Sequence, residues 1–172
     1  MLSSPDLLTL LSTAVIGFAL TSTPAIAEQP LDQKTIALSF DDAPRGQGPV
    51  WSGDQRAEQL LKSLQRANVD QVVFFVTPRN FEREGSRERI ERYGQAGHLI
   101  ANHSNTHPWL NKSDPQEYLA DIDGAETLLV DMPNHRPWFR YPYLDEGRGQ
   151  PHQITVAQGL TDRGLRNGYV TV

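Results

Sequence analysis

The stretch Val72-Val73-Phe74-Phe75-Val76 (VVFFV) decides the fold class of this chain. An unbroken run of β-branched and aromatic residues is typical of a strand that is covered on both faces, as in a parallel sheet. Amphipathic stretches of helical period lie on either side of it, at 54–67 and 86–95. Because a strand between two such helices is the βαβ pattern, we expect an α/β fold built on a parallel sheet.

The same alternation continues from residue 34 to the end of the sequence. Strands are predicted at 35–40, 72–76, 98–101, 138–140 and 169–172, the last reaching the C-terminal residue. Helices are predicted at 54–67 with a cap near Ser52, at 86–95, at 115–130 with Asp114 as N-cap and Pro115 at the first helical position, and at 151–163. About five βα units are fewer than the eight of a closed barrel, so we expect an incomplete one, without a second domain.

Composition excludes several classes of protein. The 172 residues carry 16 Lys and Arg against 21 Asp and Glu, for a net charge of −5, which argues against nucleic acid as a partner. There is no cysteine, so disulfides, cysteine-ligated zinc, iron–sulfur clusters and thiol nucleophiles are excluded. Any metal site must therefore be built from His, Asp and Glu.

The N-terminal segment resembles a signal peptide. Residues 7–20 are an apolar run, shorter than the roughly 20 residues of a membrane span, and an Ala-Ile-Ala cleavage pattern follows at 25–27. We predict a signal peptide at 1–27 and a periplasmic or secreted mature domain at 28–172, with no stable membrane span after cleavage. No Lys or Arg precedes the run. An uncleaved anchor and a buried N-terminal helix therefore remain alternatives.

Three polar clusters directly follow predicted strands. They are SFDDAP at 39–44, HSNTH at 103–107 and RYPY at 140–143. In parallel sheets, ligands bind at the carboxyl ends of the strands, so we expect the clusters to meet there. Each has an ordinary structural explanation: a solvated Asp-Asp turn, two surface histidines in a polar loop, and an arginine covering an aromatic ring.

The residue types in these clusters suit a metal-dependent hydrolase. Asp41 and Asp42 are adjacent and point to different sides, so one can bind a metal while the other acts as a free base. His103 and His107 are four apart and can present two imidazoles to one ion. Imidazoles with a carboxylate favour Zn, Co, Ni or Fe over Ca or Mg. Arg140 could pair with Asp41.

Together the three clusters resemble, in order and spacing, the first three motifs of the polysaccharide deacetylases (NodB-homology domain, carbohydrate esterase family 4). The resemblance covers about residues 34–172 and implies a distorted (β/α) barrel. It implies that Asp42, His103 and His107 bind the metal, usually Zn²⁺, with Co²⁺ and Ni²⁺ as alternatives. The implied substrate is an acetylated polysaccharide, attacked by a metal-activated water.

The resemblance also implies three roles in the reaction. Asp41 would be the general base, Arg140 would orient Asp41, and the backbone N–H of Tyr143 would stabilise the oxyanion. The sequence departs from the family at Ala43, usually Gly, at Ser39, often Thr, and at Tyr141, often Pro.

The family's later motifs, Asp-Trp and Leu-x-His, are not found in this sequence. His135 and His152 do not stand in the Leu-x-His context, so neither is assigned as the general acid. We therefore expect a C-terminally truncated deacetylase domain.

A catalytically inactive remnant that binds glycan or metal is the second hypothesis. Hydrolysis of a cyclic amide or of an O-acetyl ester is a third. No prediction of oligomeric state follows from the sequence.

Overall fold

The computed structural model describes residues 35–149 and 151–170. The predicted signal peptide at 1–27 lies outside the described residues. None of the helices in the described ranges combines the length and the apolar character that a membrane crossing requires.

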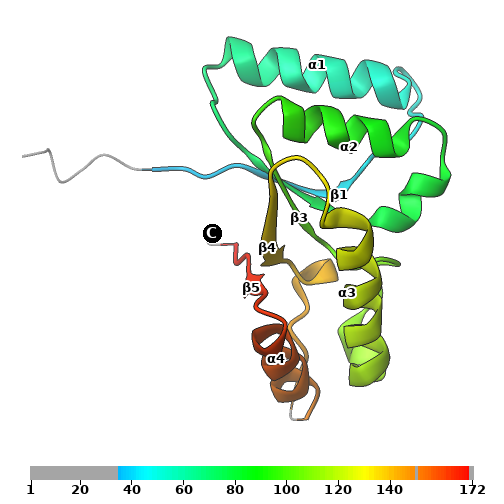
Figure 1. Ribbon diagram of the computed structural model, residues 1–172, viewed down its shortest axis with the longest axis vertical. Helices are drawn as coiled ribbons and strands as arrows, with labels where there is room; N and C mark the ends of the chain where they lie inside the picture. Colours follow the sequence, from blue (N-terminus) through cyan, green and yellow to red (C-terminus); the bar gives the residue numbers. More distant parts are fainter. Residues whose placement is uncertain (1–34, 150, 171–172) are drawn as a thin grey trace, which may run out of the picture. The chain divides into compact units, whose positions relative to one another are not determined.

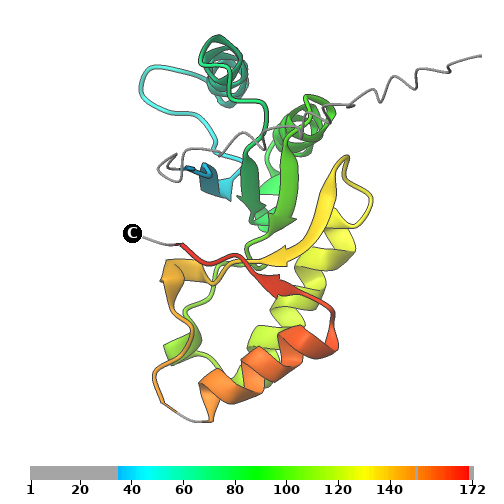
Figure 2. The ribbon, with the colours of Figure 1, turned by 90° about the vertical axis from the view of Figure 1, so that its left-hand side faces the viewer.

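Five strands form one parallel sheet in the chain order β1 to β5 (Figures 1 and 2). They are β1 (Ser39–Ala43), β2 (Val73–Val76), β3 (Leu99–Asn102), β4 (His135–Phe139) and β5 (Arg166–Asn167). The helices between them are α1 (Gly53–Arg66), α2 (Ser86–Gln95), α3 (Pro115–Leu129) and α4 (His152–Asp162). Within the described ranges there are also three short 3₁₀ helices: η1 (Pro78–Glu82), η2 (Leu110–Lys112) and η3 (Pro142–Leu144). The predicted α/β fold is confirmed.

The two best-marked helices begin where their capping residues predict. The Ser52 hydroxyl accepts from the backbone N–H of Gln55, whose side chain accepts from the Ser52 N–H, forming a capping box at α1. The Asp114 carboxylate accepts from the N–H groups of Gln116 and Glu117 at the start of α3. Such a cap stabilises a helix by about 1 kcal/mol, which explains why local sequence fixes these boundaries.

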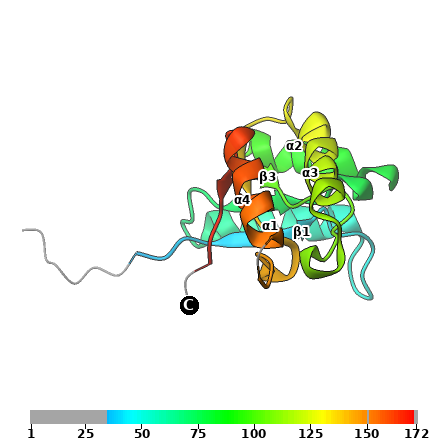
Figure 3. The same cartoon turned by 90° about the horizontal axis from the view of Figure 1, so that it is seen from below.

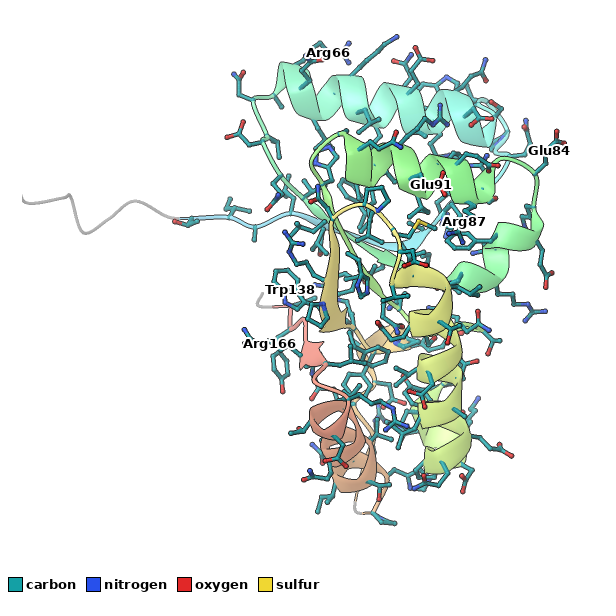
Figure 4. All side chains as sticks on the ribbon, in the orientation of Figure 1. Arg66, Glu84, Arg87, Glu91, Trp138 and Arg166 are labelled. Carbon is teal, nitrogen blue, oxygen red and sulfur yellow. The ribbon has the colours of Figure 1, made fainter. Side chains whose placement is uncertain are left out.

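The prediction of a fifth strand at 169–172 is wrong for the two residues of it that are described. The strand is Arg166–Asn167, paired with Trp138 and Phe139 of β4, and Figure 4 shows Trp138 and Arg166 on the neighbouring strands. The Gly168 N–H still donates to the Phe139 carbonyl at 2.7 Å, but β4 ends there. Tyr169 belongs to no strand and is 70% exposed.

Two other strands are displaced from their predicted ranges. β1 begins at Ser39 instead of residue 35, because its partner β2 begins at Val73, opposite Ser39. Ile36 is 81% exposed and belongs to no strand. β4 begins at His135, three residues before the predicted start.

Helices cover the outer face of the sheet. Figures 1 and 3 show α1 beside α2 and α3 beside α4, and both pairs are in contact. Phe74 of β2 stacks on Tyr93 of α2, with ring centroids 4.1 Å apart, and is 1% exposed. A second apolar cluster joins Phe139 of β4 to Ile122 of α3 and Val156 of α4. The prediction of a buried strand at 72–76 is confirmed.

The sheet is curled, so that side chains on the inner faces of β1 and the end of β4 approach one another. Arg140 follows β4 and Asp41 lies on β1, with two strands between them, yet Arg140 Nη1 lies 2.7 Å from Asp41 Oδ1. In a flat sheet those strands would be about 14 Å apart, with side chains standing perpendicular to the sheet. The sheet must therefore bend toward a barrel. Phe75 lies on this inner face, under the Arg140 guanidinium, 3.9 Å from the ring centroid to Cζ.

Candidate metal centre

Asp42, His103 and His107 come together at the carboxyl ends of β1 and β3. One possible ligand atom from each lies within 4.8 Å of the others. Asp42 Oδ1 is 3.0 Å from His107 Nε2 and 3.8 Å from His103 Nε2. The sequence predicted these three residues as the metal site, and the structure brings them together.

His103 is oriented by the strand that follows it in the sheet. Its side chain is 3% exposed, and its Nδ1 lies 2.8 Å from the carbonyl oxygen of Arg140. Because a carbonyl only accepts, Nδ1 must carry the proton, which leaves the Nε2 lone pair facing Asp42. Burial lowers the pKa of His103 below its ordinary value and favours the neutral imidazole that a metal requires.

His107 is positioned by a tightly turned loop. Ser104 and His107 both have left-handed backbones, with φ of 63° and 62°, and the His107 N–H donates to Ser104 Oγ at 3.1 Å. The Asp121 carboxylate on α3 holds the loop. It accepts from the backbone N–H groups of Asn105 and Thr106 at 2.8 and 3.1 Å, and from the Thr106 hydroxyl at 2.7 Å.

Asp42 reaches the histidines because β1 is irregular at this point. Along a regular strand, side chains alternate between the two faces. Phe40 faces outward and stacks on Phe74, while Asp41 faces inward to Arg140. The register with β2 shifts between Phe40 and Ala43, and Asp42 has a φ of 60°. This left-handed residue turns the second carboxylate toward His107, so the two adjacent carboxylates face different partners.

Asp41 is held by Arg140. The Arg140 side chain is 7% exposed, and Nη1 donates to Asp41 Oδ1 at 2.7 Å and to Ser39 Oγ at 2.6 Å. Its Nε donates to the Gly168 carbonyl at 2.8 Å. Because three acceptors surround the guanidinium, the position of Asp41 is fixed beside the metal ligands. The pairing with Asp41 and the covering of an aromatic ring, which the sequence offered as alternatives, both occur.

Tyr143 lies beside His107, one of the three candidate metal ligands. Its backbone is left-handed, with φ 60° and ψ 11°, and its ring packs edge-on against His107 with centroids 4.6 Å apart. The Trp109 ring is 5.6 Å from the Tyr143 ring. Tyr143 is 62% exposed, so the aromatic pair forms an open wall next to the metal centre.

The donor set fits a single divalent transition metal. Two imidazole nitrogens and one carboxylate oxygen are borderline ligands, and three protein ligands leave positions for water and substrate. One of the ligands is also oriented by a hydrogen bond on its far side, because His103 Nδ1–H donates to the backbone carbonyl of Arg140. The geometry therefore fits a catalytic rather than a closed structural metal site.

Sequence reasoning missed three supporting side chains. Ser39 accepts from Arg140, Asp121 holds the His107 loop, and the fully buried Asn102 accepts from the Ser104 N–H at 2.7 Å. Only Asp121 left a signal: it lies three residues after buried Tyr118 and one before buried Ile122, on the apolar face of α3. A carboxylate at such a position needs a partner.

The remaining histidines have other surroundings. His135 Nε2 lies 3.2 Å from Glu126 Oε2, His152 is the first residue of α4, and His98 packs edge-on against Phe74. None of them joins the possible metal cluster found within the described ranges. No general acid is assigned to His135 or His152.

The fold and the site define an α/β protein with a candidate mononuclear metal centre at the ends of its strands. The polysaccharide deacetylase family model matches residues 28–164. The chain belongs to this family.

Two curated relatives of the chain are named as deacetylases. The chain is 30% identical over 115 residues to a peptidoglycan-N-acetylglucosamine deacetylase of Bacillus cereus, covering 66% of this chain and 38% of the relative. It is 31% identical over 128 residues to the peptidoglycan-N-acetylmuramic acid deacetylase PdaC of Bacillus subtilis, covering 69% and 24%. The chain thus spans less than half the length of these relatives.

Among solved structures, the chain is similar to a family 4 carbohydrate esterase from Streptomyces lividans in complex with acetate. The TM-score is 0.60 at 21% identity, over 80% of this chain and 62% of the esterase. At this identity the likeness concerns the fold, which is the predicted NodB-type α/β fold.

Proposed function

We propose that this chain is a metal-dependent hydrolase that removes acetyl groups from an N-acetylated polysaccharide. The observation that carries the proposal is the pairing of two groups at one sheet edge. A three-ligand cluster of Asp42, His103 and His107 lies next to a separate carboxylate, Asp41, that is held by Arg140. A metal site with an adjacent free base is the arrangement that hydrolysis by water requires.

The cluster would hold Zn²⁺, with Co²⁺ or Ni²⁺ as alternatives. When bound, the ion supplies Lewis-acid chemistry and lowers the pKa of a coordinated water far below that of bulk water, to about 7. His103 and His107 are neutral donors and Asp42 contributes one negative charge. The other residues of the site handle the proton and the substrate.

Asp41 would accept the proton of the attacking water. Its Oδ1 pairs with Arg140 Nη1, so the carboxylate stays next to the metal ligands without being one of them. The water oxygen bonds to the acetyl carbon, the carbon–nitrogen bond then breaks, and acetate and a free amine result. The amine takes up a proton, for which we assign no donor residue.

The backbone N–H of Tyr143 would donate to the oxyanion of the tetrahedral intermediate. Two observations support this role: the Tyr143 ring packs against His107, and its backbone has a left-handed conformation. Preorganised donors of this kind typically contribute 10²–10³ in rate.

The family and the curated relatives support an acetylated polysaccharide as substrate. Both relatives are named as peptidoglycan deacetylases, one acting on N-acetylglucosamine and one on N-acetylmuramic acid. Attack at an O-acetyl ester or at a cyclic amide uses the same groups and stays an alternative. We further propose that residues 1–27 direct export and that 28–172 form the deacetylase domain, in the periplasm or outside the cell.

Acetate release tests the proposal. The chain loaded with Zn²⁺ is incubated with N-acetylglucosamine oligomers, O-acetylated xylan and a cyclic amide, and acetate and ring-opened product are measured. Asp42→Ala and His107→Ala should lose stoichiometric zinc binding. Asp41→Asn should keep the zinc and lose turnover, because an amide does not accept the proton.

Each result separates the hypotheses. Full turnover by Asp41→Asn would overturn its role as base. A zinc-loaded chain that binds saccharide and releases no acetate from any substrate would favour the inactive binding protein instead.

A further inference from the structure

A groove of about 1040 Å³ begins at the metal centre and extends away from it. Asp42, His107 and Thr106 line one end. The loop between β1 and α1 and the 3₁₀ helix η1 form its sides. Because the groove shares two residues with the metal cluster, a glycan chain with one unit at the metal would continue into it.

Four arginines line this groove: Arg45, Arg56, Arg79 and Arg83. Asp42, a candidate metal ligand, is the only carboxylate that lines it within the described part of the chain. The whole protein carries a net charge of −5, so the lining is opposite in sign to the molecule. Clustered charge of one sign in a concave surface raises the local concentration of the opposite ion.

Three of the four arginines form no ion pair with another described residue. Ion pairs among the described residues engage Arg45, which lies 3.3 Å from Asp42, but none includes Arg56, Arg79 or Arg83. The Arg56 Nε is buried and has no hydrogen-bond partner. A donor that has lost its water without gaining an acceptor is costly, unless a ligand supplies the acceptor.

The loop after β1 lies close to two of these guanidinium groups. A Cβ at Gly48 would lie 2.1 Å from Arg56 Nη2, and one at Gly46 would lie 3.4 Å from Arg83 Nη1. At Gly48 a Cβ would overlap the Arg56 guanidinium, whereas the distance at Gly46 is an ordinary van der Waals contact with Arg83. Arg56 and Arg83 thus lie next to the loop that lines the groove.

We propose that the groove binds oxyanions, carboxylate or phosphate, carried by glycan units next to the one being deacetylated. The inference rests on the proposed function, because it assigns the acetylated unit to the metal centre. Guanidinium groups pair with planar carboxylates and with phosphates through two parallel hydrogen bonds. The preferred substrate is thus an acidic, N-acetylated polysaccharide rather than a neutral one.

Four tetrasaccharides with the same N-acetylglucosamine backbone test this. One is unmodified, one bears lactyl carboxylates on alternate units, one bears the same groups reduced to alcohols, and one bears phosphate on the 6-hydroxyls. Dissociation constants are measured with the Zn²⁺-loaded Asp41→Asn chain, so that the saccharides stay intact. Acetate release from the same saccharides by the protein without the Asp41→Asn substitution is measured in parallel.

We expect the carboxylate or phosphate form to bind about tenfold more tightly than the neutral and reduced forms at low salt, as two or three exposed charge pairs provide. The difference should disappear in 1 M salt, where the screening length is about 3 Å. Whichever of the two charged saccharides binds more tightly identifies the preferred oxyanion as carboxylate or phosphate. Equal affinity for all four would overturn the inference.

Variants assign the effect to the groove. The double variant Arg79→Gln, Arg83→Gln should lose most of the preference for charged saccharides. The double variant Arg79→Lys, Arg83→Lys should retain part of it. Arg66→Gln is the matched control, because Figure 4 shows Arg66 at the end of α1 away from the Glu84 loop. Loss of preference in the control and not in the double variant would contradict the assignment.

The inference and the proposed function fail separately. Equal acetate release from charged and neutral forms overturns the groove inference and supports the deacetylase. A charge preference in binding without acetate release overturns the deacetylase and supports the groove as an oxyanion site.

Discussion

Arg140 Nη1 lies 2.7 Å from Asp41 Oδ1, joining two residues that are 99 positions apart in the sequence. The backbone carbonyl of the same arginine accepts from His103 Nδ1. One residue therefore orients both the proposed base and a proposed metal ligand, the first through its side chain and the second through its main chain.

This division of roles predicts the effect of substituting Arg140. Arg140→Gln should lower kcat/KM roughly 100-fold, because Asp41 loses its orienting partner, while zinc affinity changes little, because the carbonyl remains. Arg140→Lys should recover part of the activity. Steady-state kinetics and zinc titration check this, with exposed Arg136→Gln as control. An equal loss of zinc binding would show a purely structural role.

The carboxylate that holds the histidine loop should affect the metal. Asp121→Ala removes three acceptor contacts to Asn105 and Thr106, so the loop that carries His107 should loosen. We expect a 10–100-fold loss of zinc affinity, typical of outer-layer changes. Competition with a chelator measures it. Asp131→Ala, outside the loop, should leave the affinity unchanged, and a matching loss there would contradict the mechanism.

Asn102 should be important for stability. It is fully buried, donates to the Ile122 carbonyl and to Glu126, and accepts from the Ser104 N–H. Asn102→Ala leaves these groups without their partner, so the free energy of unfolding should fall by about 1–3 kcal/mol. Urea unfolding measures the change. Exposed Gln95→Ala should have almost no effect, and a stable Asn102→Ala chain would argue that water replaces the amide.

The ion pair between α3 and α4 predicts a pH dependence. Arg163 Nε and Nη2 donate to the two oxygens of Asp123 at 2.6 and 2.7 Å. The hydrogen bond from Arg163 lowers the pKa of Asp123 in the folded chain. Since the folded pKa lies below the unfolded one, the pair stabilises above the ordinary carboxyl range and loses this effect as pH falls through the folded pKa.

Asp123→Asn should therefore reduce stability by about 0.5 kcal/mol near neutral pH, a small effect because Asp123 is half exposed. The difference between the two chains should shrink below about pH 4. Unfolding curves at neutral and acid pH test this. A difference that grows on acidification would have the wrong sign for this pair.

Much of the fold follows from local sequence. The Ser52 and Asp114 caps and the apolar run at 72–76 act through neighbours in the chain, so the two capped helices and the buried strand β2 were predictable. The ends of β1, β4 and β5 were not, because they depend on where a partner strand begins or stops. Tyr169 and Val170 look like strand residues, but β4 no longer runs beside them.

The candidate site also contains residues that the sequence could predict and others that it could not. Asp41, Asp42, His103, His107 and Arg140 could be placed at one sheet edge from their positions after predicted strands, and their roles stay predictions. The contribution of Ser39 could not be foreseen, because it depends on the curl that brings β1 to Arg140. The bulge that turns Asp42 also has no local signature, since the left-handed residue is an aspartate and not a glycine.

The way the sheet brings β1 and β3 together makes the candidate metal centre sensitive to assembly of the sheet. Asp42 enters from the first strand, His103 from the third, and the Arg140 that supports them follows the fourth. Because the three candidate ligands come from β1 and from the segment after β3, chains in which these strands have not joined one sheet should have little affinity for the ion. Release of bound metal during denaturation should coincide with loss of the sheet, and added metal should raise the melting temperature of the protein.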